Sequence, residues 1–160
     1  MYKRQDWFNP DNWSDGVPHP SSVVTIPGNT SHQPEINKLG NAYSMHLENN
    51  ASLTLNDSAA NLRVFHDWIN KGTFTANYGT VTFSSCIDDT IKIESHHLET
   101  YYNLVVNNHQ NVKIDGGNQK ILNNLTIASG IIHSPNDTIF IMDNATAVSY
   151  THLRAHETRH

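Results

Sequence analysis

The sequence is dominated by a long series of short segments in which apolar and polar residues alternate. From about Asn41 these segments begin anew every ~8–12 residues, and they are rich in Val, Ile, Thr and Phe, which suit half-buried strands. The best candidate for the 3.6-residue period of an amphipathic helix, residues 61–70, fits a strand and a turn equally well. The pattern predicts an all-β domain of many short strands. The segments are Met45–Leu47, Ser52–Leu55, Leu62–Phe65, Thr73–Thr75, Val81–Phe83, Ile91–Ile93, Leu104–Val106, Val112–Ile114, Leu125–Ile127, Ile131–Ile132 and Ile139–Ile141.

Internal repetition narrows the choice of β architecture. Asn70-Lys71-Gly72-Thr73 is echoed seven residues later at 77–80, and the pair Asn-Leu occurs at 61–62, 103–104 and 124–125, at separations of 42 and 21. A fixed period of this length is typical of solenoids. We therefore expect coils of about 21 residues, each with two or three strands.

The polar composition favours the same architecture. The 160 residues include 20 Asn, 13 Ser and 14 Thr, whereas only 16% are charged. Stacked coils lie ~4.8 Å apart, so equivalent Asn side chains can form ladders, and Asn tolerates the left-handed conformation that tight corners require. A β-sandwich would explain the strands but not the Asn register. The prediction is a parallel β-solenoid, with a β-sandwich as the alternative.

Several classes of protein are excluded. A single cysteine, Cys86, cannot build a disulfide scaffold, and no apolar run approaches the ~18 residues of a membrane span. The composition lacks the abundant Glu, Lys, Leu and Ala of a coiled coil. A net charge of −5 argues against nucleic acid as a partner.

Both ends of the chain resemble translated sequencing-adapter DNA. The resemblance covers residues 1–5 and about 148–160, and we exclude them from the fold argument. Four of the 10 basic and one of the 15 acidic residues lie there, so the remainder carries 6 basic and 14 acidic residues and a charge of −8. The i, i+4, i+8 spacing of His152, His156 and His160, which could bind a metal on a helix, falls in the same excluded segment. We expect the native part to be an internal piece of a longer gene product.

The remaining chain divides into two regions. Residues 6–40 hold five of the six prolines and two of the three tryptophans, with one clear strand ended by Pro27-Gly28. We assign 6–40 to an N-terminal capping segment and 41–147 to the solenoid coils.

Four segments carry a resemblance to a known group of proteins. They are similar to the repeat regions of large secreted bacterial surface proteins, in particular adhesin-like substrates of type IX secretion. The resemblance implies a right-handed parallel β-helix that the Trp-rich segment opens, and export to the cell surface. The segments are 7–18 followed by 22–27, 51–55, 70–77 with 79–83, and 101–108.

Two acidic residues in the capping segment are candidate calcium ligands. Asp11, Trp13, Asp15 and Gly16 occupy positions 1, 3, 5 and 6 of a calcium loop, but Trp13 replaces an oxygen ligand and no Glu stands at position 12, so an EF-hand is excluded. A looser site with Asp11 and Asp15 is one hypothesis. The alternative is a capping turn in which Trp7 and Trp13 cover the end of the core.

Aromatic residues supply a second candidate site. Trp68, Tyr78, Tyr101 and Tyr102 could form an exposed row on which sugars stack, although packing in the core is the ordinary fate of such residues.

The acidic pair Asp88 and Asp89 beside Cys86 could act in acid/base chemistry, with a solvated loop as the alternative. His96 and His97 point to opposite sides of a strand and make a poor metal pair.

Together these features predict a non-enzymatic structural and adhesive segment of a large secreted cell-surface protein of bacteria. We expect no resident cofactor, apart from the calcium hypothesis, and no membrane span. Partners would be surface glycans or other cell-surface proteins. The alternative is a piece of a β-helical carbohydrate-binding or carbohydrate-active protein whose active coils lie outside this chain.

Overall fold

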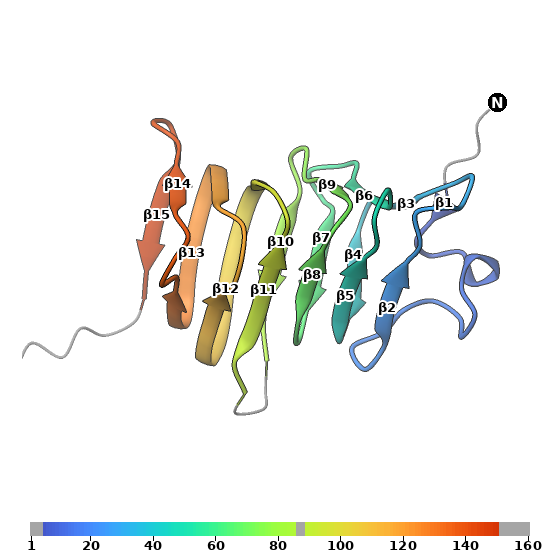
Figure 1. Ribbon diagram of the computed structural model, residues 1–160, viewed down its shortest axis with the longest axis horizontal. Coiled ribbons are helices and arrows are strands. Elements are labelled where there is room, and N and C mark those ends of the chain that lie inside the picture. Colours follow the sequence, from blue (N-terminus) through green and yellow to red (C-terminus); the bar gives the residue numbers. More distant parts are fainter. Residues whose placement is uncertain (1–4, 86–88, 151–160) are drawn as a thin grey trace, which may run out of the picture.

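The computed structural model describes residues 5–85 and 89–150. The chain winds into a parallel β-solenoid of about six coils (Figure 1). It ascends the near side and descends the far side while it advances from right to left in this view, which makes the winding right-handed. Every strand pairing among the described residues is parallel, so the predicted solenoid is confirmed and the sandwich is not formed.

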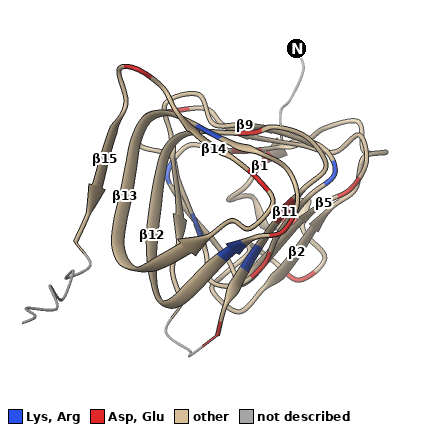
Figure 2. Ribbon diagram, turned by 60° about the vertical axis from the view of Figure 1, so that its left-hand side comes forward, with Lys and Arg blue, Asp and Glu red and all other residues tan. Residues whose placement is uncertain are grey.

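The coils present three faces, which Figure 2 shows nearly end-on. The front face, nearest the viewer in Figure 1, holds β2 (Val23–Ile26), β5 (Ser44–Leu47), β8 (Trp68–Asn70) and β11 (Ile91–Ser95). The upper face holds β1 (Gln5–Asp6), β3 (Pro34–Ile36), β6 (Ser52–Leu55), β9 (Thr73–Thr75) and β14 (Ile139–Ile141). The rear face holds β4 (Leu39–Ala42), β7 (Asn61–Val64), β10 (Thr80–Phe83) and β15 (Thr146–Ser149), while β12 (Glu99–Ile114) and β13 (Gln119–His133) bend around the corners through all three faces.

The observed repeat agrees with the period expected from the sequence. On the rear face Asn103 pairs with Asn124, a repeat of 21 residues, and the other neighbouring pairs are 19 to 23 residues apart. Each of the first three coils holds three separate strands, whereas β12 and β13 each cover the three faces as one bent strand.

The interior is a continuous apolar column. Leu62, Val81, Leu104 and Leu125 occupy the same register position in four successive coils and are all buried. The alternation of side-chain direction along a strand turns these four side chains inward. Leu125, which begins one of the alternating segments predicted from the sequence, is part of this core.

Asparagine fills the two structural roles that its abundance predicts. Asn50 (φ 65°) and Asn77 (φ 41°) occupy the left-handed region at corners of the coil. On the rear side Asn123 Nδ2 donates to Asn103 Oδ1 at 2.7 Å, and Thr146 Oγ1 donates to Asn124 Oδ1 at 2.8 Å. These bonds connect successive coils, so the ladders are mixed Asn and Thr ladders.

The repeated Asn-x-Gly-Thr motif has a local explanation. The Gly72 N–H donates to Asn70 Oδ1 at 2.9 Å, and the Thr73 N–H donates to the Ala51 carbonyl of the preceding coil at 2.8 Å. A Cβ on Gly72 would collide with that same carbonyl. Glycine is therefore required because two coils approach each other closely at this corner.

Strand stacking begins before residue 41. β2 pairs with β5, β3 with β6 and β4 with β7, so the first coil starts at Val23 and the irregular part of the capping segment ends before it. At the other end β15 pairs with β13 as far as Ser149. The adapter-like residues 1–4 and 151–160, including the three terminal histidines, lie outside the described residues.

Candidate functional site

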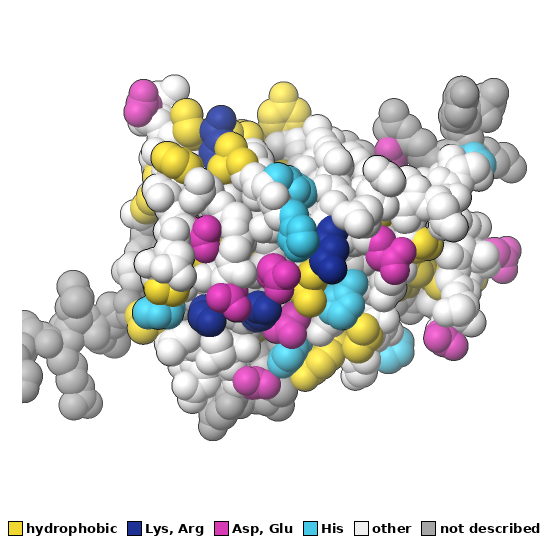
Figure 3. Space-filling view, in the orientation of Figure 1, with side chains coloured by type: hydrophobic (Ala, Val, Ile, Leu, Met, Phe, Trp, Pro, Cys, Tyr) yellow, Lys and Arg dark blue, Asp and Glu magenta, His cyan; other side chains and the backbone are white. Residues whose placement is uncertain are grey.

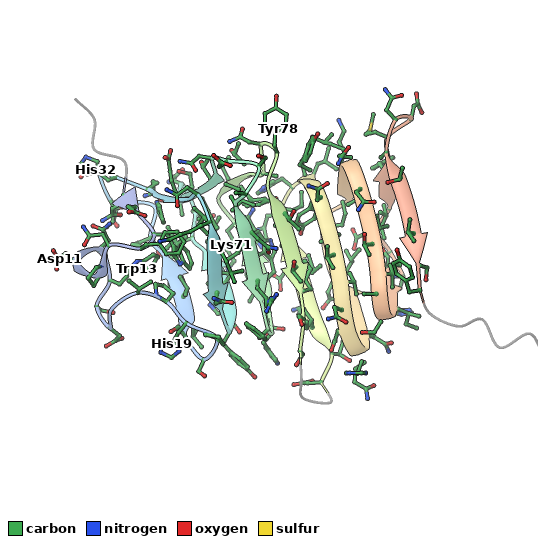
Figure 4. All side chains as sticks on the ribbon, turned by 180° about the vertical axis from the view of Figure 1, so that it is seen from behind. Asp11, Trp13, His19, His32, Lys71 and Tyr78 are labelled. Atoms are coloured by element: carbon green, nitrogen blue, oxygen red, sulfur yellow. The ribbon has the colours of Figure 1, made fainter. Side chains whose placement is uncertain are left out.

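The capping segment closes the N-terminal end of the core. Trp7 is fully buried, and the ring of Trp13 meets it edge-on at 4.8 Å between centroids with an interplanar angle of 68°. Trp13 Nε1 donates to the Trp7 carbonyl at 2.8 Å, which fixes the orientation of the second indole. Figure 4 shows Trp13 at this end of the solenoid. The arrangement matches the capping-turn interpretation of this segment.

The two candidate calcium ligands lie in the same segment and are exposed. Asp11 belongs to a 3-10 turn (Pro10–Asn12), where its N–H donates to Asn9 Oδ1 at 3.1 Å. Asp15 accepts a hydrogen bond from Ser14 Oγ at 3.2 Å. Among the described residues no three or more His, Cys, Asp or Glu side chains gather in a way that could hold a metal ion. The described residues therefore add no cluster of acidic side chains to the calcium hypothesis.

The structure corrects the hypothesis that four aromatic residues form an exposed stacking row. Trp68 and Tyr101 are completely buried, because both occupy inward positions of their strands. Tyr78, 64% exposed, and its neighbour Tyr102 reach the surface where the upper and rear faces meet. Their rings pack edge to face at 5.2 Å, and Tyr78 projects outward in Figure 4. The surface aromatic site is thus this pair alone.

A buried carboxylate lies at the centre of the aromatic core. Glu99 is 1% exposed, and its Oε2 accepts from Trp68 Nε1 at 3.0 Å and from Asn70 Nδ2 at 2.7 Å. Burial raises the pKa of Glu99 above its ordinary value, although these two hydrogen bonds oppose the rise. Burial also raises the pKa of Tyr101 far above its usual range, and its hydroxyl has no partner within the described part of the chain. Sequence reasoning missed this cluster, whose only signal was an acid at an inward position.

Charged side chains gather on the front face (Figure 3). Lys92 Nζ lies 2.8 Å from Glu94 Oε2 and 3.4 Å from Asp115 Oδ2, and Lys113 Nζ lies 3.1 Å from Asp115 Oδ1. The Lys92 hydrogen bond lowers the pKa of Glu94, and the Lys113 hydrogen bond lowers that of Asp115. The charges are balanced and partly solvated, so they cross-link neighbouring coils weakly.

Of the acidic pair beside Cys86, only Asp89 belongs to the described residues. Cys86 and Asp88 lie outside the described residues. Asp89 Oδ2 lies 3.1 Å from His66 Nε2, and this hydrogen bond lowers the pKa of Asp89. The ring of Tyr43 stacks on His66 at 5.0 Å. His96, the first residue of the His pair, lies 3.6 Å from Glu94 at the rim of the front-face network.

Comparison with known proteins finds no match among family models, curated proteins or solved structures. In the described part of the chain, no helix has the length and apolar character needed to cross a membrane.

Proposed function

We propose that this chain is a non-enzymatic structural and adhesive segment of a secreted bacterial cell-surface protein. The observation that carries the proposal is the uninterrupted stack of parallel coils around one apolar column. In such a stack each coil is hydrogen-bonded to the next, so the molecule behaves as a stiff, quasi-one-dimensional rod. A rod of this kind can hold neighbouring domains away from a cell envelope.

The surface of the rod supports the adhesive part of the proposal. Polar ladders and balanced ion pairs lie on its sides, and the exposed Tyr78 stands beside the half-buried Tyr102 at one corner. Secretion and the bacterial source follow from the resemblance of the Trp-rich and Asn-Gly-Thr segments to surface proteins. They are part of the proposal.

Pulling single molecules of the full chain along the solenoid axis tests the stalk role. We expect unfolding in steps that release one coil each, about 7 nm of contour for a repeat near 21 residues at ~3.5 Å per residue. A single low-force event that releases the whole chain at once would contradict a stacked, load-bearing rod.

The second candidate is a carbohydrate-binding coil, favoured by Tyr78 and Tyr102. An exposed ring next to a half-buried one offers a sugar a stacking surface with a fixed wall. Tyr78→Ala should abolish retention of the chain on a glycan-coated surface if this corner binds sugar. Tyr43→Ala, which removes a ring stacked on His66 elsewhere on the solenoid, is the matched control.

A further inference from the structure

The capping segment encloses a cleft against the first strand of the solenoid. The cleft has a volume of about 470 Å³ and lies between the loop from Trp13 to Pro18 and residues 21–25, which include the start of β2. A second hollow of about 270 Å³ adjoins it, and Trp13, Ser14 and Thr25 line both. The larger volume falls within the ~300–1,000 Å³ typical of ligand sites.

One wall of this cap cleft is the edge of a sheet. Within the described residues β2 pairs only with β5, so the opposite edge of β2 has no strand beside it. Such an edge presents backbone N–H and C=O groups that seek hydrogen-bond partners. Val23, 62% exposed, lies on this strand and lines the cleft.

The opposite wall combines an aromatic ring with oxygen-bearing side chains. The indole of Trp13 is held in place by its bond to the Trp7 carbonyl and by the edge-on contact with that ring. Asp15 and Ser14 belong to the same wall, Ser21 lines the cleft from the β2 side, and Gly16 (φ 74°) forms the turn that places Asp15 there. A carboxylate accepts hydroxyl hydrogen bonds strongly, and serine hydroxyls both donate and accept.

These features select one class of ligand. A carboxylate in a cleft that no Lys, Arg or His lines disfavours phosphates and other anions. Many hydroxyl groups together with one apolar ring face are the features of a sugar, which the hydroxyl acceptors and the indole would both engage. We propose that the cap cleft binds a neutral saccharide, with its hydroxyls on Asp15, Ser14 and the edge of β2 and its apolar face on Trp13.

This inference names a ligand for the adhesive role, and it rests on the proposed function for its biological setting only. It places the sugar at the N-terminal cap, away from the corner formed by Tyr78 and Tyr102. It also gives Asp15 a role other than calcium ligation.

The test is a binding measurement on the full chain with methyl glycosides and disaccharides of glucose, galactose, mannose and N-acetylglucosamine, followed by saturation-transfer NMR and calorimetry. Asp15→Asn should weaken the best of these ligands about tenfold, because it removes a charged acceptor. The matched control is Asp11→Asn, an exposed acid of the same segment that does not line the cleft, and it should leave affinity unchanged within about twofold. Trp13→Phe should also weaken binding, with thermal unfolding used to check that the cap persists.

Three results would overturn the inference. The first is that none of these saccharides binds, and the second is that binding survives Asp15→Asn but is lost in Tyr78→Ala. The third is that only an extended tetrapeptide probe binds, which would assign the edge of β2 to strand addition. A chain that unfolds coil by coil under force and yet binds no saccharide would overturn this inference while leaving the stalk proposal intact.

Discussion

The two ends of the solenoid differ in how far their apolar side chains are covered. At the N-terminal end Trp7 is fully buried beneath Trp13, and Lys38 Nζ lies 4.2 Å from the ring centre of Phe8. At the C-terminal end the last coil leaves apolar side chains at the surface, with Phe140 46% and Val148 41% exposed. Among the described residues only the N-terminal end of the column is covered in this way, so stability should not be shared evenly by the coils, since each coil depends on its neighbours.

The largest expected effect is the loss of stability when a buried leucine of the core column is replaced by a charged residue, compared between an earlier and a later coil. Leu62→Asp should destabilise the protein by about 5 kcal/mol, because it buries an unpaired charge between two coils. Leu125→Asp should cost about 3 kcal/mol, since the C-terminal coils can open locally around the charge. Urea unfolding followed by circular dichroism measures both. Equal losses would contradict the uneven distribution of stability, and no loss at Leu125 would mean that it is not core.

Removal of an aromatic ring at each end should give the next largest difference. Trp7→Ala should cost about 4 kcal/mol, because it empties the space beneath the cap. Phe140→Ala should change the free energy of unfolding by less than about 0.5 kcal/mol, as is usual for exposed positions. Thermal and urea unfolding of the pair give the values. A Phe140 loss as large as the Trp7 loss would show that the C-terminal end is covered as well.

Between the ends, the buried Glu99 predicts a particular pH dependence. Its pKa is raised on folding, so the folded state binds the proton more tightly and stability falls as the pH rises above the ordinary glutamate pKa through the folded value. The slope for one proton is at most about 1.4 kcal/mol per pH unit. Glu99→Gln, followed by urea unfolding at a series of pH values, should flatten the profile in that window.

Glu94 serves as the matched control for that experiment. The Lys92 hydrogen bond lowers the pKa of Glu94, so its contribution is present above the ordinary glutamate pKa and is lost as the pH falls through the folded value. Glu94→Gln should therefore change the profile in the opposite direction. If Glu99→Gln leaves the pH profile unchanged, the carboxylate is not buried as described.

The smallest expected effect concerns the ion pairs of the front face. Lys92→Met should alter the free energy of unfolding by no more than about 1 kcal/mol, because the pairs are partly solvated. The difference should shrink further in 1 M salt, where charges are screened beyond ~3 Å. A larger, salt-independent loss would mean that this network, rather than the core column, holds neighbouring coils together.

The architecture could be predicted from the sequence because each coil of a solenoid repeats a similar pattern of residues at a regular spacing. The spacing of Asn-Leu pairs at 61, 103 and 124 is the register of the rear face, and alternation placed Leu125 correctly in the core. Asparagine at corners and in ladders also followed from its known conformational range and its amide group.

The sites were harder to predict, because side-chain direction depends on the exact start of each strand. The sequence leaves Trp68 and Tyr101 open to an exposed row or to the core, and in the structure both are buried, whereas Tyr102, one residue further, reaches the surface. β2 lies within the capping segment but pairs with β5 of the next coil. The cap cleft forms because the Pro-rich loop folds back onto β2. Local sequence carries no signal for such long-range contacts.

Native-state hydrogen exchange measured by mass spectrometry tests the central claim most directly. A parallel solenoid whose described residues cover the core at the N-terminal end and leave apolar side chains exposed in the last coil predicts graded protection. The amides of β5, β7 and β8 should exchange most slowly, with those of β14 and β15 fastest and the coils between them ordered along the axis. Uniform protection of all coils, or the slowest exchange in β14 and β15, would contradict the account.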